Sequence, residues 1–319
     1  MMTTPRIYPY LQLDVFTNRA LEGNPLAVFP DGIGISDREM QRIAREMNLS
    51  ETVFVLPPVA PKALRKLRIF TPARELPFAG HPVVGTWNAL ATLGVVPPPA
   101  ENEGSTRVYQ ELGIGVLPVD VEFKNGAPAN VVMTQGPFEL GPVITDQDKR
   151  AEIAAALGLD AADLHASLPI RTMSTGVPYV AVPLRDFAAL ERARVINDPL
   201  GAMTKSLGAL GCYLFSTETK DGSDSGAHAR MFVADEGIGE DPATGSAGGP
   251  LGGYLVYHDA LEVAANDGVF RFVVEQGDFI DRPSRLRLEV RGAPHASIDE
   301  VRVGGPSVIV ARAELILPG

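Results

Sequence analysis

The sequence predicts an α+β protein made of two pseudo-symmetric, barrel-like antiparallel sheets, each wrapped around a central helix. Three observations lead to this fold class: motifs rich in Gly and Pro recur in one order, strand-like runs precede them in both copies, and two helix-like stretches contain no charged residue. With 319 residues, of which 45% are hydrophobic and 21% charged, the chain is long enough to bury the cores of two domains.

An internal repeat organises the chain, and its two copies are separated by 153 to 166 residues. The matching segments are residues 23–30 with 176–183, 75–80 with 240–245, 111–118 with 275–283, and 126–128 with 292–294. One such match is weak, and chance recurrence of loop residues is the alternative, but four matches in one order favour a duplicated fold. The repeat predicts a first domain at 1–138 and a second at 139–304. An alternating apolar run is left over at the end of the chain, so we expect residues 305–319 to return to the first domain as a closing strand.

Helix and strand signals occupy equivalent places in the two copies. A capping-box pattern at 36–39 opens a helix in the first copy. In the second copy, the triplet Asn197-Asp198-Pro199 predicts a cap followed by a proline at the first helical position. Strands are expected at residues 52–56, 68–70, 213–216 and 230–232.

Two stretches that follow the repeated Glu-x-Pro loops, 78–100 and 242–257, lack any charged residue. A surface helix needs a polar face, and these stretches are too short to span a bilayer, so we expect protein to enclose them. Each is therefore predicted to form the central helix of one sheet. Several glycines and Pro250 near the start of the second helix predict a distorted first turn there.

Composition excludes several classes of function. The net charge of −11 argues against binding to nucleic acid or to an anionic membrane surface. Cys212 is the single cysteine, which excludes an internal disulfide and a cysteine-based zinc site, and the five histidines lack metal-ligand spacing, so no metal is expected. Neither a signal-like run nor a long apolar stretch is present, which makes the cytoplasm the expected location.

The two repeated loops supply the first candidate site residues. Each loop ends at the start of a predicted buried helix, where unpaired N–H groups and a positive partial charge suit a carboxylate; Gly80 and Gly245 permit close approach. His81 and Ser246 then take equivalent positions, with Asp241 five residues before Ser246, and we expect them to line the cleft between the two halves. The alternatives are ordinary ones: a capping or core histidine, a turn aspartate and an N-cap serine.

Glu51 is the candidate acid/base. It precedes the apolar strand 52–56, where loss of solvent would raise the pKa of its carboxyl group towards the range useful for proton transfer. A water-exposed glutamate at a strand edge is the alternative. The second copy has Gly211 or Cys212 at this place, so the proposed acid/base is present in one half only.

Several motifs resemble those of the phenazine-biosynthesis isomerase (PhzF-like) family. They lie at residues 13–17, 23–28, 48–52, 68–72, 77–82, 240–247, 275–277 and 282–284. The resemblance implies the diaminopimelate-epimerase-like fold and isomerase chemistry without a cofactor. It implies that Glu51 is the acid/base and that His81, Asp241 and Ser246 belong to the site. Asn24, in the second of these motifs, is counted with Gly80, Gly245 and Ser246 as substrate-binding.

The resulting hypothesis is a cofactor-independent isomerase of the trans-2,3-dihydro-3-hydroxyanthranilate-isomerase type. Glu51 would remove a proton from a carbon of a small carboxylate substrate and return it elsewhere, with Asp241 and His81 completing the catalytic set. The alternatives are a racemase or epimerase of an amino-acid-like compound, with Asp241 as second base, and a non-catalytic small-molecule-binding protein. Departures from the family pattern at Val83, Val84 and Asp281 leave the substrate open. A homodimer is the expected assembly.

Overall fold

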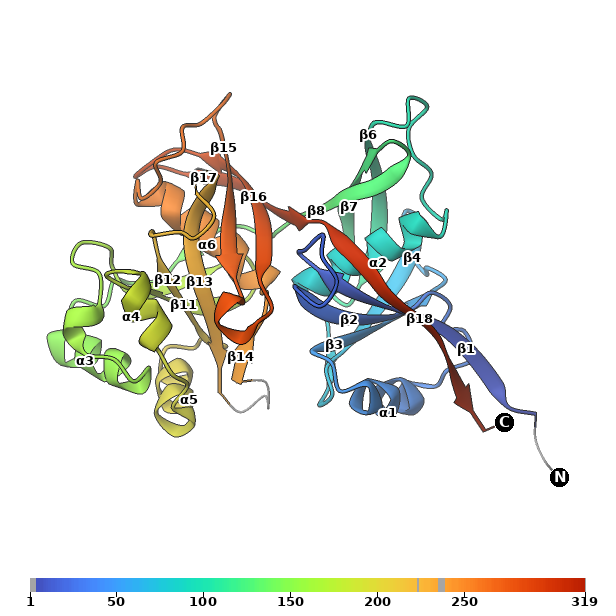
Figure 1. Ribbon diagram of the computed structural model, residues 1–319, viewed down its shortest axis with the longest axis horizontal. Coiled ribbons are helices and arrows are strands. Elements are labelled where there is room, and N and C mark those ends of the chain that lie inside the picture. The colour runs from blue at the N-terminus through green and yellow to red at the C-terminus, as the bar shows by residue number, and fades with distance from the viewer. Residues whose placement is uncertain (1–3, 223, 235–238, 319) are drawn as a thin grey trace. The chain divides into compact units, whose positions relative to one another are not determined.

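The computed structural model describes residues 4–222, 224–234 and 239–318, and the chain forms two compact units (Figure 1). Unit 1 comprises the chain up to Met133 together with the segment from Gly304 onward, and unit 2 comprises Thr134–Val303. The fold is α+β in both units, as the sequence predicted. In the part of the chain that the structure describes, no helix is both long and apolar enough to cross a membrane.

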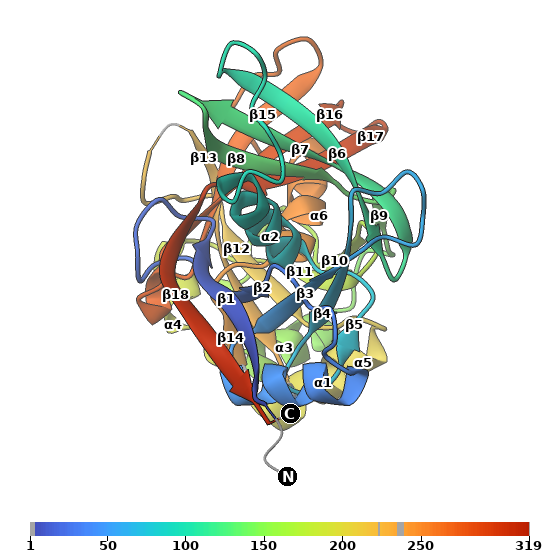
Figure 2. The same ribbon diagram turned by 90° about the vertical axis from the view of Figure 1, so that its right-hand side faces the viewer.

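Unit 1 is a mixed sheet with two helices. Its strands are β1 (Arg6–Val15), β2 (Asn24–Phe29), β3 (Glu51–Leu56), β4 (Arg65–Phe70), β5 (Glu75–Leu76), β6 (Gly104–Leu112), β7 (Gly115–Lys124), β8 (Ala127–Thr134) and β18 (Ser307–Leu317). Most neighbours are antiparallel, but β2 runs parallel to β3 and β4 parallel to β6. The last strand, β18, runs antiparallel to β1 along its whole length, from Arg6 opposite Leu317 to Val15 opposite Ser307 (Figure 2).

The two helices of unit 1 differ in surroundings. Helix α1 (Asp37–Met47) has the predicted capping box between Ser36 and Glu39, and its buried face covers stacked aromatic rings of the sheet that include Phe29 and Phe54. Helix α2 (Gly80–Thr92) is buried on nearly every side and contacts β1, β2, β3, β7 and β18. The absence of charge in its sequence is therefore explained by its position as the core of the sheet.

Unit 2 repeats this plan with added helices. Its strands are β9 (Glu139–Leu140), β10 (Arg171–Ser174), β11 (Pro178–Pro183), β12 (Cys212–Ser216), β13 (Ser225–Val233), β14 (Gly239–Asp241), β15 (Val269–Gln276), β16 (Ser284–Gly292) and β17 (Ile298–Gly305). Its helices are α3 (Gln147–Ala156), α4 (Phe187–Arg192), α5 (Asn197–Ser206) and α6 (Gly245–Tyr257), with short 3₁₀ turns η1 (Ala161–Asp163) and η2 (Asp278–Ile280).

Helix α6 is the buried central helix of unit 2, and its glycines allow close packing. A Cβ atom at Gly249 would lie 1.8 Å from the side chain of Gln135, and one at Gly253 would lie 2.6 Å from the ring of Phe138. The helix continues without interruption through Pro250, so the expected distortion does not break it.

Helix α5 begins earlier than the sequence predicted. Its N-cap is Ile196, which makes no side-chain cap bond, and Asn197 and Pro199 are already helical. Because a proline also fits the first turn beyond its first position, the sequence alone does not fix the start of such a helix.

The pairing pattern confirms the internal repeat. Strands β11, β12, β13 and β15 pair as β2, β3, β4 and β6 do, in the same parallel and antiparallel order. The registers also correspond: Ala27 lies opposite Thr52 where Val180 lies opposite Cys212, which makes Gly211 the counterpart of Glu51. By the same comparison, Leu76 is the counterpart of Asp241.

Candidate functional site

Three candidate residues come together in unit 1. Glu51 begins β3, Asn24 begins β2, and His81 is the second residue of α2. The Nε2 atom of His81 lies 3.1 Å from Oε2 of Glu51, and Nδ2 of Asn24 lies 3.3 Å from Nδ1 of His81. Gly23 makes this placement possible: its φ is +68°, and a Cβ atom there would lie 2.3 Å from the carbonyl oxygen of Val15.

The unit 1 group is shielded from solvent. The side chains of Glu51 and His81 are 13% and 6% exposed, which removes the alternative of a water-exposed glutamate at a strand edge. Burial lowers the pKa of His81 to about 3, so its imidazole is neutral at neutral pH. Gly80 is the first residue of α2, and the N-cap residue Ala79 makes no side-chain hydrogen bond to the first turn. The group therefore combines a buried carboxylate, a neutral imidazole and a helix N-terminus.

The other candidates lie in unit 2, around the start of α6. Asp241 ends β14, Gly245 begins α6 and Ser246 follows it. The hydroxyl of Thr244, the N-cap residue of α6, donates a hydrogen bond to Oδ2 of Asp241. This contact connects Asp241 to the N-terminus of α6, so the loop and the helix together position its carboxylate.

Gln276 organises this loop and was not among the residues that the sequence singled out as functional. It is fully buried at the end of β15, where its Nε2 donates to the carbonyl oxygen of Asp241 at 2.7 Å. Its Oε1 accepts from the backbone N–H of Thr244 at 3.0 Å and from the hydroxyl of Tyr213 at 2.7 Å. The sequence did contain a signal for this role, because Gln276 lies in an apolar strand just before Gly277. A side-chain amide that is buried there needs specific hydrogen-bond partners.

Two tyrosines also contribute to the unit 2 group. The hydroxyl of Tyr179 lies 2.8 Å from Oγ of Ser246, and Tyr179 is buried. Burial, reinforced by the charge of Asp241 and by Tyr179, raises the pKa of Tyr213 well above its ordinary value. Tyr213 is therefore a permanent hydrogen-bond donor, which fixes the orientation of the Gln276 amide.

Cys212 offers no alternative base. It is fully buried, and burial raises the pKa of its thiol far above the usual range, so a thiolate is not populated at neutral pH. Among residues 4–222, 224–234 and 239–318, no group of three or more His, Cys, Asp or Glu side chains could hold a metal ion.

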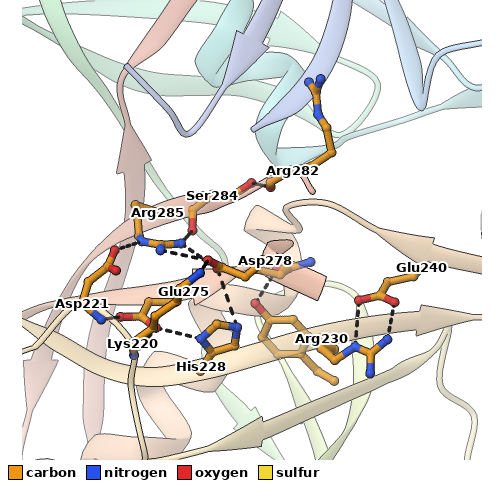
Figure 3. A network of polar contacts seen from close by, with 12 residues as sticks. Lys220, Asp221, His228, Arg230, Glu240, Glu275, Asp278, Arg282, Ser284 and Arg285 are labelled. Atoms are coloured by element: carbon orange, nitrogen blue, oxygen red, sulfur yellow. Dashed lines mark hydrogen bonds and ion pairs between the residues drawn. The ribbon is translucent and has the colours of Figure 1, made fainter. Parts of the chain in front are cut away.

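A second polar cluster in unit 2 surrounds His228 (Figure 3). Nδ1 of His228 lies 2.7 Å from Oε2 of Glu275, and Nε2 lies 3.7 Å from Oδ2 of Asp278. Arg285 pairs with Asp278 at 2.9 Å. Glu275 also accepts the backbone N–H groups of residues 220 and 221, each at 2.8 Å, and so ties the loop after β12 to the sheet. These contacts join β13, β15, η2 and the loop after β12 within unit 2.

Comparisons with known proteins agree with this fold. The PhzC-PhzF family, described as phenazine biosynthesis-like protein, matches residues 13–313. An uncharacterized isomerase of Clostridium acetobutylicum is 36% identical over 312 residues, covering 98% of this chain and 99% of its own. The trans-2,3-dihydro-3-hydroxyanthranilate isomerase of Pseudomonas aeruginosa is 35% identical over 314 residues, covering 97% and 100%.

Solved structures give the same result. The PhzF-family phenazine biosynthesis protein of Bacillus anthracis superposes with a TM-score of 0.84 at 28% identity, over 97% of this chain and 99% of its own. A hydroxyproline epimerase of Agrobacterium vitis shares the fold, with a TM-score of 0.64 at 14% identity over 100% and 95% of the two chains.

Proposed function

The chain belongs to the PhzC-PhzF family of phenazine biosynthesis-like proteins and is an isomerase, and we propose that it moves a proton within a small carboxylate substrate without a cofactor. The substrate class that we propose is the dihydro-hydroxyanthranilate type, which the names of several relatives specify. A homodimer in the cytoplasm is part of the same proposal.

The observation that carries the proposal is the placement of Glu51. Its carboxylate is shielded from solvent and lies 3.1 Å from a neutral imidazole, while the chain's one thiol is buried and protonated. A base in such a place accepts a proton from a carbon activated by a neighbouring π-system and returns it to another carbon of the same system, so that the double bonds shift and nothing is oxidised or reduced. Positioned acid/base groups of this kind contribute about 10²–10⁴-fold in rate.

The unit 2 residues take the complementary part in this proposal. Asp241, fixed by Thr244, would bind an amino or hydroxyl group of the substrate, and Ser246 with the N–H groups at Gly245 would bind its carboxylate. Gly80 would add the same kind of donor from α2.

The test is conversion of trans-2,3-dihydro-3-hydroxyanthranilate in D₂O, with product and deuterium content followed by mass spectrometry. We expect the wild-type protein to incorporate solvent deuterium and Glu51→Gln to lose about 10²–10⁴-fold in kcat with little change in KM, because the lost group acts in the transition state. Glu46→Gln, an exposed glutamate of α1, is the matched control and should behave as wild type.

One observation favours a second candidate, an epimerase or racemase. The oriented carboxylate of Asp241 could serve as a second base, which inversion at a carbon requires. Undiminished deuterium exchange in Glu51→Gln, together with its loss in Asp241→Asn, would transfer the base to Asp241 and favour this candidate.

A further inference from the structure

Asn24, His81 and Glu51 form a continuous chain of contacts inside unit 1. The side-chain amide of Asn24 faces one ring nitrogen of His81, at 3.3 Å, and Glu51 faces the other, at 3.1 Å. Asn24 is 0% exposed, whereas the Glu51 side chain is 13% exposed. Asn24 is thus the most deeply buried of the three and lies on the far side of His81 from Glu51.

The polarity of this chain follows from simple donor and acceptor rules. An amide nitrogen only donates, so Nδ1 of His81 must accept and cannot carry a proton. A neutral imidazole with a bare Nδ1 has its proton on Nε2, the atom that faces Glu51. An ionised Glu51 carboxylate is compatible with a ring N–H facing it at this distance, whereas a bare Nε2 would face it with like charge. The reversed order, with Nδ1–H donating to the amide oxygen, would require a protonated Glu51 that donates to Nε2.

We propose that Asn24 is a positioning residue that holds His81 as the Nε2–H tautomer, so that the protonated ring nitrogen faces Glu51 and Glu51 rests as a base. The effect of this tautomer on catalysis rests on the proposed function. The tautomer itself does not, because it is a property of the protein without substrate. Burial keeps the ring neutral, as the lowered pKa of His81 indicates, so a doubly protonated ring does not compete at neutral pH.

The second unit shows that the arrangement is not a requirement of the fold. The counterparts of Asn24, Glu51 and His81 in the repeat are Val177, Gly211 and Ser246. Val177 and Gly211 have no polar side chain, so these three residues could not form such a chain, although the strands pair in the same register. The chain of contacts among Asn24, His81 and Glu51 is therefore specific to the unit that carries the proposed base.

The experiment is ¹⁵N NMR of the imidazole nitrogens at neutral pH, with His81 assigned by the signals that disappear in His81→Gln. We expect the wild-type ring to show a protonated Nε2 and a bare Nδ1. A wild-type ring protonated at Nδ1 would overturn the inference, whatever the activity of any variant.

Asn24→Asp reverses the polarity at nearly constant shape, because a carboxylate only accepts. We expect a proton to appear on Nδ1 and kcat to fall about 10–100-fold, a part of the general acid/base contribution, with KM little changed. Asn102→Asp makes the same chemical change at an exposed turn of unit 1 and should alter neither property. Loss of activity with an unchanged tautomer in folded Asn24→Asp would overturn the proposal.

The NMR spectrum tests the His81 tautomer, and the deuterium assay tests Glu51 as the base, so either result can be negative without the other. A protonated Nε2 in the wild type, with the predicted shift in Asn24→Asp, supports the tautomer even if Glu51→Gln keeps full exchange, and in that case only the assignment of Glu51 as base is lost.

Discussion

The paired strands before α2 and α6, β4 with β5 and β13 with β14, contain the same ion pair in two different environments. Arg68 binds Glu75 in unit 1 and Arg230 binds Glu240 in unit 2, each through Nε and an Nη atom at 2.6–2.9 Å. The unit 1 side chains are 18% and 42% exposed, whereas those in unit 2 are 6% and 10% exposed. Figure 3 shows the pair of unit 2. Arg230 also donates hydrogen bonds to the carbonyl oxygens of Leu190 and Ala193. We therefore expect the same contact to contribute differently to the stability of the two units.

The site residues differ more than the framework does. Glu51 in unit 1 corresponds to Gly211, while Asp241 and Gln276 in unit 2 correspond to Leu76 and Leu112. The strands that carry these residues pair in the same order and direction in both units. The comparison indicates that the strand framework is alike in both copies, whereas the polar side chains at these strand ends differ between the two units.

The largest expected difference in stability concerns the two arginines. Arg230→Met should lower the free energy of unfolding by about 3–5 kcal/mol, because it leaves Glu240 buried and unpaired. Arg68→Met should cost about 1 kcal/mol or less, since Glu75 regains water. Urea denaturation of both variants measures the two values, and equal losses would show that the difference in exposure has no energetic consequence.

Gln276→Leu places the unit 1 residue type at the equivalent position of unit 2. It removes the partners of the Asp241 carbonyl, the Thr244 N–H and the Tyr213 hydroxyl, and should cost about 2–4 kcal/mol, since each buried polar group left unpaired costs about 1–3 kcal/mol. We also expect weaker substrate binding, because the Asp241 loop loses its support. Gln147→Leu, at the exposed start of α3, is the control, and a Gln276→Leu protein with wild-type stability and KM would contradict the role of Gln276.

The smallest effect should appear in the acid dependence of stability. Burial of Glu275 raises its pKa, but hydrogen bonds from His228, Ser225 and two backbone N–H groups outweigh this and lower it to about 2. Because the folded-state pKa is below the ordinary value of 4.5, this carboxylate stabilises the fold above about pH 4.5, and its contribution is lost as the pH falls towards 2.

Glu275→Gln should therefore lose on the order of 2 kcal/mol at neutral pH and approach the wild-type stability near pH 2. Its unit 1 counterpart, Glu111, has a pKa lowered first by the N–H of Ala60 and then by Lys66, and Glu111→Gln should show a smaller change over the same range. Urea denaturation across this pH range measures both variants. A constant difference between Glu275→Gln and wild type at every pH would mean that the loss arises from packing and not from charge.

Local signals predicted much of this fold. The capping box at Ser36 and Glu39 is present because both partners lie within one helical turn, and the charge-free stretches are indeed the buried helices α2 and α6. The predicted start of α5 was wrong because Asn197 and Pro199 are compatible with more than one position in the first turn of a helix. Gln276 and Tyr179 were missed as site residues because their partners lie 32 and 67 residues away along the chain.

The sequence by itself determined the duplicated α+β architecture, the two enclosed helices and the presence of Glu51 in one copy only, since these depend on periodicity, charge and order along the chain. Tertiary structure alone decided the surroundings of each polar group. Strand pairing and burial give Glu51 its imidazole neighbour, orient that ring through Asn24, and hold Asp241 through Thr244 and Gln276. The physical reason is that hydrogen bonds and desolvation act over a few ångströms in space, whereas the residues that meet here are distant in sequence.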